Sequence, residues 1–151
     1  MPNPYTLHPI PYSLIKNRGV SSRLMAFPLD RLDHIVLTVA SIDAAVDFYT
    51  EVLGMEMVVI EGRKHLTFGV QTIKLHQRGH ELSPHATHPV PGSADLCFVT
   101  TTPLEEVMEY LNALKIHIEE GPVQRASGLG KLRSVYIRDP DRNLIEIAND
   151  L

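Results

Sequence analysis

The stretch LDHIVLTVASIDAAVDFYTEVLGM, residues 32–55, decides the fold. Its first part alternates apolar residues with polar or smaller ones, which is the period of a β-strand with one buried face. Ser41 then provides a helix N-cap, and apolar residues recur at three- and four-residue spacing from Ile42 to Leu53, before Gly54. The stretch therefore predicts a strand followed by a short amphipathic helix.

Three strand-like segments follow this helix and complete a first module. Glycine turns separate them, and they lie at about 56–60, 64–68 and 71–76. The module therefore has the order β-α-β-β-β and occupies residues 31–76. A polar, proline-containing linker, residues 77–92, then leads to a second strand-like run and a second amphipathic helix, LEEVMEYLNALK.

The same order repeats in residues 93–149. Adding 61 to the numbers of the first module carries His34 to Asp95 and preserves the apolar positions of the helix, which indicates an internal repeat. The remaining strands are expected at about 116–119, 132–138 and 144–148. Because each module is too small to bury both of its surfaces, two modules must pair, within a chain or across a homodimer that exchanges modules. We expect the homodimer, with two sites.

Residues 1–29 precede this pattern and differ from it in composition. They contain five prolines and no Asp or Glu. We expect a flexible extension, although a basic, acid-poor composition also permits an organelle-targeting peptide.

Charge and hydrophobicity exclude several classes of partner. The 151-residue chain has a net charge of -4 with both signs scattered, which disfavours binding to nucleic acid. No apolar run approaches the roughly 20 residues needed to span a bilayer, which disfavours a membrane protein. Cys97 is the one cysteine and cannot form an intramolecular disulfide, which favours a reducing, cytoplasmic setting.

The expected strands have two contrasting faces, because successive side chains point to opposite sides. One face is apolar and should pack under the helices: Ile35, Leu37, Val39, Ile73, Leu75, Leu96, Phe98, Ile145 and Ile147. The opposite face has polar groups on four strands: His34, Lys74, His76, Asp95, Cys97 and Glu146.

Imidazole and carboxylate groups on that polar face suggest a divalent metal ion, with Zn, Ni, Mn and Fe as candidates. A catalytic ion needs about three protein ligands and an open position. His34, His76 and Glu146 would form a set of two imidazoles and one carboxylate. His34, Asp95 and Glu146 would form a set richer in oxygen, which suits a harder ion. Spacing alone leaves both sets open.

Two segments carry a resemblance to a known family. Residues 32–55 and the segment VYIRDPDRNLIEI, residues 135–147, resemble the glyoxalase, bleomycin-resistance and extradiol-dioxygenase superfamily, also called vicinal oxygen chelate. The segments IKLHQ, HPVPGSAD, EEGPV and RDPDRNLIE are similar to glyoxalase-domain-containing protein 5 and bacterial relatives. Arg142 replaces the usual glycine of the last turn, an exchange that we interpret as structural.

This resemblance implies an α+β fold in which two modules form an open, strongly curved, barrel-like sheet with helices on its convex face. It also implies one metal ion held by the first and last strands of two modules. His34 and Glu146 match two of those ligand positions. Asp95 stands where many relatives have histidine, and Lys74 stands where glutamate is frequent. Because an ammonium cannot bind a cation, His76 is a candidate substitute for Lys74.

The resemblance further implies a metal ion that stabilises negative charge on two neighbouring oxygens of a small-molecule substrate. With His34, His76 and Glu146 as ligands and Glu146 or Asp95 as catalytic base, we expect a metal-dependent lyase or isomerase acting on a small oxygenated substrate, such as a thiol adduct.

Two alternatives stay open. The first is a ring-cleaving dioxygenase, whose additional histidines have no evident placement in this sequence: His65, His80, His85, His88 and His117. The second is a non-catalytic ligand-binding protein of the bleomycin-resistance type, which Lys74 and Asp95 favour, whereas His34 and Glu146 oppose it. We interpret Cys97 as a packing residue, and His85 and His88 as parts of a linker that could overhang the groove.

Overall fold

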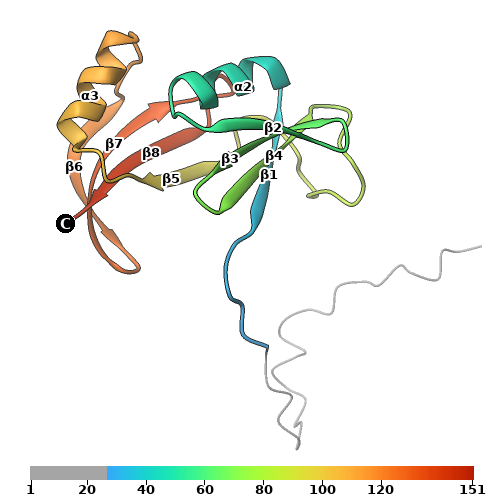
Figure 1. Cartoon of the computed structure of the whole chain (residues 1–151), viewed down its shortest axis with the longest axis horizontal. Helices are drawn as coiled ribbons and strands as arrows, with labels where there is room; N and C mark the ends of the chain where they lie inside the picture. The colour runs from blue at the N-terminus through green and yellow to red at the C-terminus, as the bar shows by residue number, and fades with distance from the viewer. Residues whose placement is uncertain (1–26) are drawn as a thin grey trace, which may run out of the picture. The chain divides into compact units, whose positions relative to one another are not determined.

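The computed structural model describes residues 27–151, of which Leu32–Leu151 form one compact unit (Figure 1). The extension expected over residues 1–29 lies almost wholly outside the described residues. No helix in residues 27–151 has both the length and the apolar character needed to cross a bilayer. The elements in chain order are β1 (His34–Val39), α2 (Ile42–Glu51), β2 (Glu56–Ile60), β3 (Arg63–Phe68), β4 (Gln71–Gln77), β5 (Asp95–Val99), α3 (Leu104–Ala113), β6 (Glu120–Ser127), β7 (Gly130–Arg138) and β8 (Leu144–Asp150).

These elements form two β-α-β-β-β modules with the same topology. The strand order is β1-β4-β3-β2 in the first sheet and β5-β8-β7-β6 in the second. In both sheets the first and last strands of the module are parallel neighbours, and the other neighbours are antiparallel. The predicted α+β fold with a repeated module is confirmed, in the form of two separate curved sheets that do not close into a barrel.

Both helices lie close to where the pattern predicts them. The Ser41 hydroxyl accepts a hydrogen bond of 3.2 Å from the backbone N–H of Ala44 and so caps α2. The helix ends at Glu51, two residues before the expected Leu53. The chain then reverses at Gly54, whose φ of +68° lies in the left-handed region that favours glycine. Helix α2 packs on β3, and α3 packs on β7.

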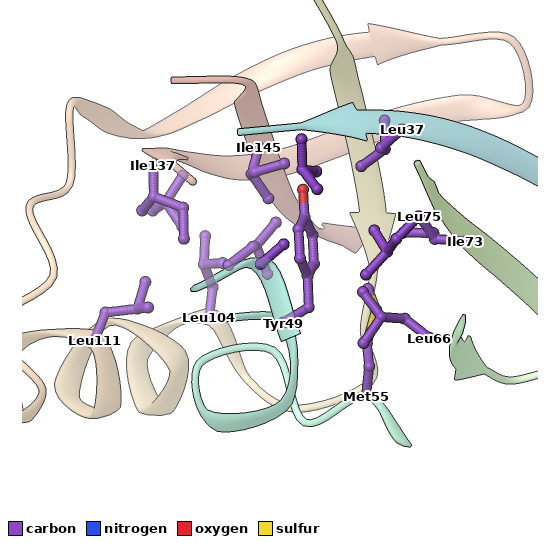
Figure 2. Packing of buried hydrophobic residues seen from close by; sticks show 14 residues of the cluster. Leu37, Tyr49, Met55, Leu66, Ile73, Leu75, Leu104, Leu111, Ile137 and Ile145 are labelled. Atoms are coloured by element: carbon purple, nitrogen blue, oxygen red, sulfur yellow. The ribbon is translucent and has the colours of Figure 1, made fainter. Parts of the chain in front are cut away.

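One hydrophobic core serves both modules. Tyr49 of α2 is fully buried, and in Figure 2 its ring lies between Ile145 of the second module and Leu37 and Leu75 of the first. The residues of the predicted apolar face are either buried or packed against this cluster. The core therefore fixes how the two modules of one chain sit together.

A buried carboxylate links α2 to the turn between β7 and β8. Oδ2 of Asp139 accepts hydrogen bonds of 2.8 Å from the hydroxyl of Tyr49 and from Nδ2 of Asn143. Its Oδ1 accepts from the backbone N–H groups of Asp141 and Asn143. Arg142 in the same turn has a φ of +69°, which explains why glycine is the usual residue at this position.

The prediction of a strand at residues 116–119 is wrong. The strand that pairs with β7 on its outer side is β6, which begins at Glu120 and continues to Ser127. Ile116 and Ile118 instead pack against the core from an irregular segment, which accounts for their apolar alternation. Pro122 is accommodated because β6 is an edge strand.

Gly121 in β6 is required by a close approach of two backbones. Its φ is +119°, and an added Cβ would lie 2.6 Å from the carbonyl oxygen of Ser134. Gly121→Ala is therefore expected to lower the free energy of unfolding by about 2–3 kcal/mol, measured by urea denaturation. Gly128→Ala is the matched control, because its Cβ would meet nothing within 4 Å. Equal losses in the two variants would contradict this account.

Candidate functional site

The first sheet turns one polar face away from the core. We call it the module-one face, and its members are His34, Val36, Thr38, Arg63, His65, Thr72, Lys74 and His76. They follow from the two-residue alternation of β1, β3 and β4 against their buried residues. His65 on β3 pairs with Lys74 on β4, which in turn pairs with Val36 on β1.

His34 begins β1 and has a carboxylate partner that sequence reasoning missed. Its Nδ1 lies 3.0 Å from Oδ2 of Asp33. A carboxylate in this position favours a proton on Nδ1, which leaves the lone pair of Nε2 available. Metal-binding histidines are commonly oriented by such a carboxylate. His34 is therefore arranged as an imidazole ligand should be.

The strand register separates His34 from His76. His34 pairs with Thr72, whereas His76 pairs with Thr38. The two histidines are thus four residues apart along the paired strands, or roughly 13 Å at about 3.3 Å per residue. Lys74 is closer to His34, because it stands only two residues after Thr72, the pairing partner of His34.

The second sheet turns an equivalent polar face away from the core. We call it the module-two face, and its members are Asp95, Cys97, Ser134, Tyr136, Glu146 and Asp150. Cys97 on β5 and Tyr136 on β7 pair with Glu146 on β8 from its two sides. The buried hydroxyl of Ser134 donates a hydrogen bond of 2.5 Å to Oε1 of Glu146. The Glu146 carboxylate therefore has a fixed position on this face.

The same diagonal arrangement, in which two polar residues on neighbouring parallel strands are offset by two positions, occurs on both faces. His34 pairs with Thr72, two residues before Lys74, and Asp95 pairs with the residue two before Glu146. The internal repeat seen in the sequence is thus preserved in the strand register. It places Lys74 in the first module where Glu146 stands in the second.

The two faces have opposite electrostatic character. Burial first, then the positive charges of Lys74 and Arg63, lowers the pKa of His65. On the other face, burial first, then the negative charge of Glu146, raises the pKa of Cys97 to about 11, and Asp95 and Asp150 act in the same direction. The module-one face is therefore basic. The module-two face has three carboxylates, Asp95, Glu146 and Asp150, and its cation Arg138 is paired with Glu119, so this face is acidic. A thiol with this pKa is no nucleophile at neutral pH. The expected packing role of Cys97 is wrong, however, because its side chain is exposed on β5 and lies outside the core.

A second group of polar side chains borders Glu146. Nε of Arg125 donates a hydrogen bond of 3.1 Å to the hydroxyl of Tyr136, and Nη2 of Arg125 lies 2.6 Å from a carboxylate oxygen of Glu120. The guanidinium also lies 5.4 Å from the centre of the Tyr136 ring. Because these contacts hold Tyr136 in place, one wall beside Glu146 is rigid.

The imidazole and carboxylate donors of His34, Asp95 and Glu146 suit a divalent metal ion chemically. Within residues 27–151 of one chain, however, no three His, Cys, Asp or Glu side chains come close enough to share such an ion. The core joins the modules through their apolar sides, whereas the candidate ligands stand on the opposite faces.

Two cavities adjoin the module-one face. One of about 430 Å³ lies beneath the linker and is lined by His85 and His88 together with Thr38 and His76. The linker histidines therefore do overhang the sheet. A larger cavity of about 1150 Å³ lies between the modules, and its lining includes Asp33 and His34 of the first module and Cys97 of the second beside apolar residues such as Ile73.

Three contributors to the site had no usable sequence signal. Asp33 precedes β1 in the sequence, Ser134 is an ordinary residue of β7, and His65 lies in the short segment RKHLTF. Only the folded arrangement shows that Asp33 and Ser134 hold His34 and Glu146, and that His65 is buried next to Lys74.

Several known proteins are similar to this chain in both sequence and fold. The sequence model of the Glyoxalase/Bleomycin resistance protein/Dioxygenase superfamily matches residues 31–147. Virulence protein STM3117 of Salmonella typhimurium is 51% identical over 121 residues, which are 80% of this chain and 84% of that protein. Its crystal structure superposes with a TM-score of 0.81 at 49% identity, covering 83% of this chain and 100% of that one.

Two other similar proteins have names that refer to glyoxalase chemistry. The glyoxalase domain-containing protein RDO1 of Mycosarcoma maydis is 47% identical over 119 residues, which are 78% of this chain and 67% of that protein. The crystal structure of lactoylglutathione lyase from Agrobacterium tumefaciens superposes with a TM-score of 0.63 at 28% identity, covering 82% of this chain and 96% of that one.

Proposed function

The chain belongs to the Glyoxalase/Bleomycin resistance protein/Dioxygenase superfamily, and from this premise we propose that it is a metal-dependent lyase or isomerase. Its substrate is a small oxygenated molecule such as a thiol adduct. The observation that carries the proposal is the repeated diagonal, which offers the His34 imidazole on one face and the Asp95 and Glu146 carboxylates on the other. The similarity to a lactoylglutathione lyase supports the substrate class.

The proposed metal ligands are His34, Asp95 and Glu146. Asp33 orients the first of them, and Ser134 orients the last. His76 is left out because the register places it four residues from His34. A divalent ion bound by this set would stabilise negative charge on two neighbouring substrate oxygens.

The proposed site lies between two copies of the chain, in a homodimer with two sites. The basic module-one face of one copy meets the acidic module-two face of the other, so the charges are complementary. Each face also exposes apolar side chains, with Val36 exposed by 44% on the first and Val99 by 55% on β5. Pairing the faces would remove these side chains from water.

Glu146 has the second proposed role of catalytic base. A carboxylate beside the substrate can take a proton from the carbon next to a carbonyl group and return it to the neighbouring carbon. Ser134 would hold Glu146 in the orientation for both transfers. Tyr136, fixed by Arg125, would limit the space open to water on that side.

Metal content and turnover test this proposal directly. Protein purified without chelators should contain about one divalent ion per chain by elemental analysis, and it should convert the hemithioacetal of methylglyoxal and glutathione or a related thiol adduct. Chelation should abolish turnover, and adding the ion back should restore it. If no ion is retained and none can be added back, the proposal fails.

Lys74 supports a second candidate function, a ligand-binding protein of the bleomycin-resistance type. An ammonium at the position equivalent to Glu146 reduces the number of metal ligands and offers a positive charge to a ligand. Such a protein would bind its ligand equally well before and after chelation, and it would not convert the ligand into a product.

A ring-cleaving dioxygenase stays a prediction, for which oxygen uptake with catechols is the test.

We also propose a cytoplasmic location. The support is Cys97, whose position as the one cysteine of the chain fits a reducing compartment. Fractionation of cells that express the full chain is the corresponding measurement.

A further inference from the structure

The module-one face concentrates positive and imidazole groups in one patch. Arg63 and His65 lie two residues apart on β3, and Lys74 and His76 lie two residues apart on β4. The pairing of His65 with Lys74 places all four side chains on neighbouring strands and on the same face. Arg63 and Lys74 each act electrostatically on both histidines, which shows that the four groups are close.

The two cations of this patch have no carboxylate partner among residues 27–151. Other basic residues of the chain are paired, for example Lys64 with Asp43 at 2.7 Å and Arg125 with Glu120 at 2.6 Å. No ion pair within the described part of the chain involves Arg63 or Lys74. Within one chain these two like charges have no counter-charge, so the patch is suited to a ligand that brings negative charge into the space between it and the acidic face of the partner copy.

The two histidines have unused hydrogen-bonding capacity. His65 is only 7% exposed, and its Nδ1 is buried without a hydrogen-bond partner among the described residues. Nδ1 of His76 is in the same situation. Burial first, and then neighbouring positive charge, lowers the pKa of both rings, so both are neutral at pH 7 and retain one N–H donor each. Buried polar atoms without partners are rare in native proteins and call for a ligand.

The cavity of about 430 Å³ beneath the linker adjoins one end of this patch, where His76 is the patch residue that lines it. It reaches His76 and Thr38 from the side of the linker residues His85 and His88. This volume lies in the range of small-molecule sites.

From this arrangement we propose that Arg63, His65, Lys74 and His76 form a subsite that binds an oxyanion of the substrate, either a carboxylate or a phosphate group. The subsite rests on the proposed function in so far as it names the substrate class. A small oxygenated substrate with an anionic group would bind through this group on the module-one face. Its reacting oxygens would then point toward the acidic face of the partner copy.

Binding of simple anions tests the subsite independently of turnover. The probes are inorganic phosphate and malonate, titrated separately into the full-length protein by calorimetry, with imidazole NMR signals recorded in parallel. Wild-type protein should bind one anion per chain and shift the signals of His65 and His76. Lys74→Met should weaken binding at least about tenfold, because a charge-assisted hydrogen bond is lost. Preference for phosphate or malonate identifies the chemistry of the group.

Lys131→Met is the matched control, because it removes the same charge from an exposed position on the second sheet. It should leave anion binding unchanged, whereas Arg63→Met should weaken binding and covers the case in which Lys74→Met fails to fold. Absence of saturable binding in wild-type protein, or equal binding in the Arg63 and Lys131 variants, would overturn the subsite. Metal content measured on the same samples separates this result from failure of the proposed metal site.

Discussion

Mixing His34→Ala chains with Glu146→Gln chains is expected to restore about a quarter of the wild-type metal content, although each variant alone binds almost none. Loss of one of three ligands should weaken metal binding by two orders of magnitude or more. If the ligands come from two copies, random pairing makes half of the dimers mixed. Each mixed dimer has one intact site and one doubly altered site. The measurement is elemental analysis after joint refolding or coexpression.

Asp95→Asn mixed with Glu146→Gln provides the control. Both changes lie on the module-two face, so every site in every dimer lacks one carboxylate and no metal should return. If the His34 and Glu146 variants also fail to complement each other, the site is not shared between copies. Complementation would at the same time establish a homodimer whose sites are shared between the two copies.

Asp139→Ala is expected to reduce the free energy of unfolding by about 4 kcal/mol. The change removes four hydrogen bonds and leaves the Tyr49 hydroxyl and Nδ2 of Asn143 buried without a partner, whereas Oδ1 of Asn143 still accepts from the backbone N–H of Ala94. Burial first, and then the Asp139 charge, raises the pKa of Tyr49, so its hydroxyl stays a neutral donor. Urea denaturation monitored by circular dichroism gives the free energies.

Tyr49→Phe provides the comparison within the same network. It removes one hydroxyl and keeps the ring, so we expect a loss of about 1–2 kcal/mol. In a chain that already lacks the Asp139 carboxylate, the same change should cost almost nothing, because its partner is gone. Additive losses in the double variant would show that the Tyr49–Asp139 hydrogen bond does not stabilise the fold.

The repeat and the two faces of each strand could be predicted because both depend on local geometry. Alternation in residues 34–39 requires only that successive side chains point to opposite sides, whatever the strand pairs with. The membership in the superfamily followed from the same segments, and the family match confirms it. The narrower resemblance to glyoxalase-domain-containing protein 5 stays a prediction.

Strand β6 shows where local pattern failed. Its sequence EGPVQRAS has little strand propensity, and its conformation depends on pairing with β7 across a turn. The apolar alternation at Ile116 and Ile118 was real but reflected packing against the core from an irregular segment. Alternation of apolar residues alone does not distinguish a paired strand from an irregular segment that packs against the core.

Some features of the candidate site likewise follow from the sequence, whereas others depend on the tertiary structure. The sequence by itself determined that His34, Asp95 and Glu146 stand on polar faces, because that follows from position within a strand. Register decided that Lys74, and not His76, is near His34, since pairing across strands has no signal in either strand alone. The shared core decided that residues 27–151 of one chain bring no three such ligands together, because packing of the apolar sides turns the two polar faces away from the core.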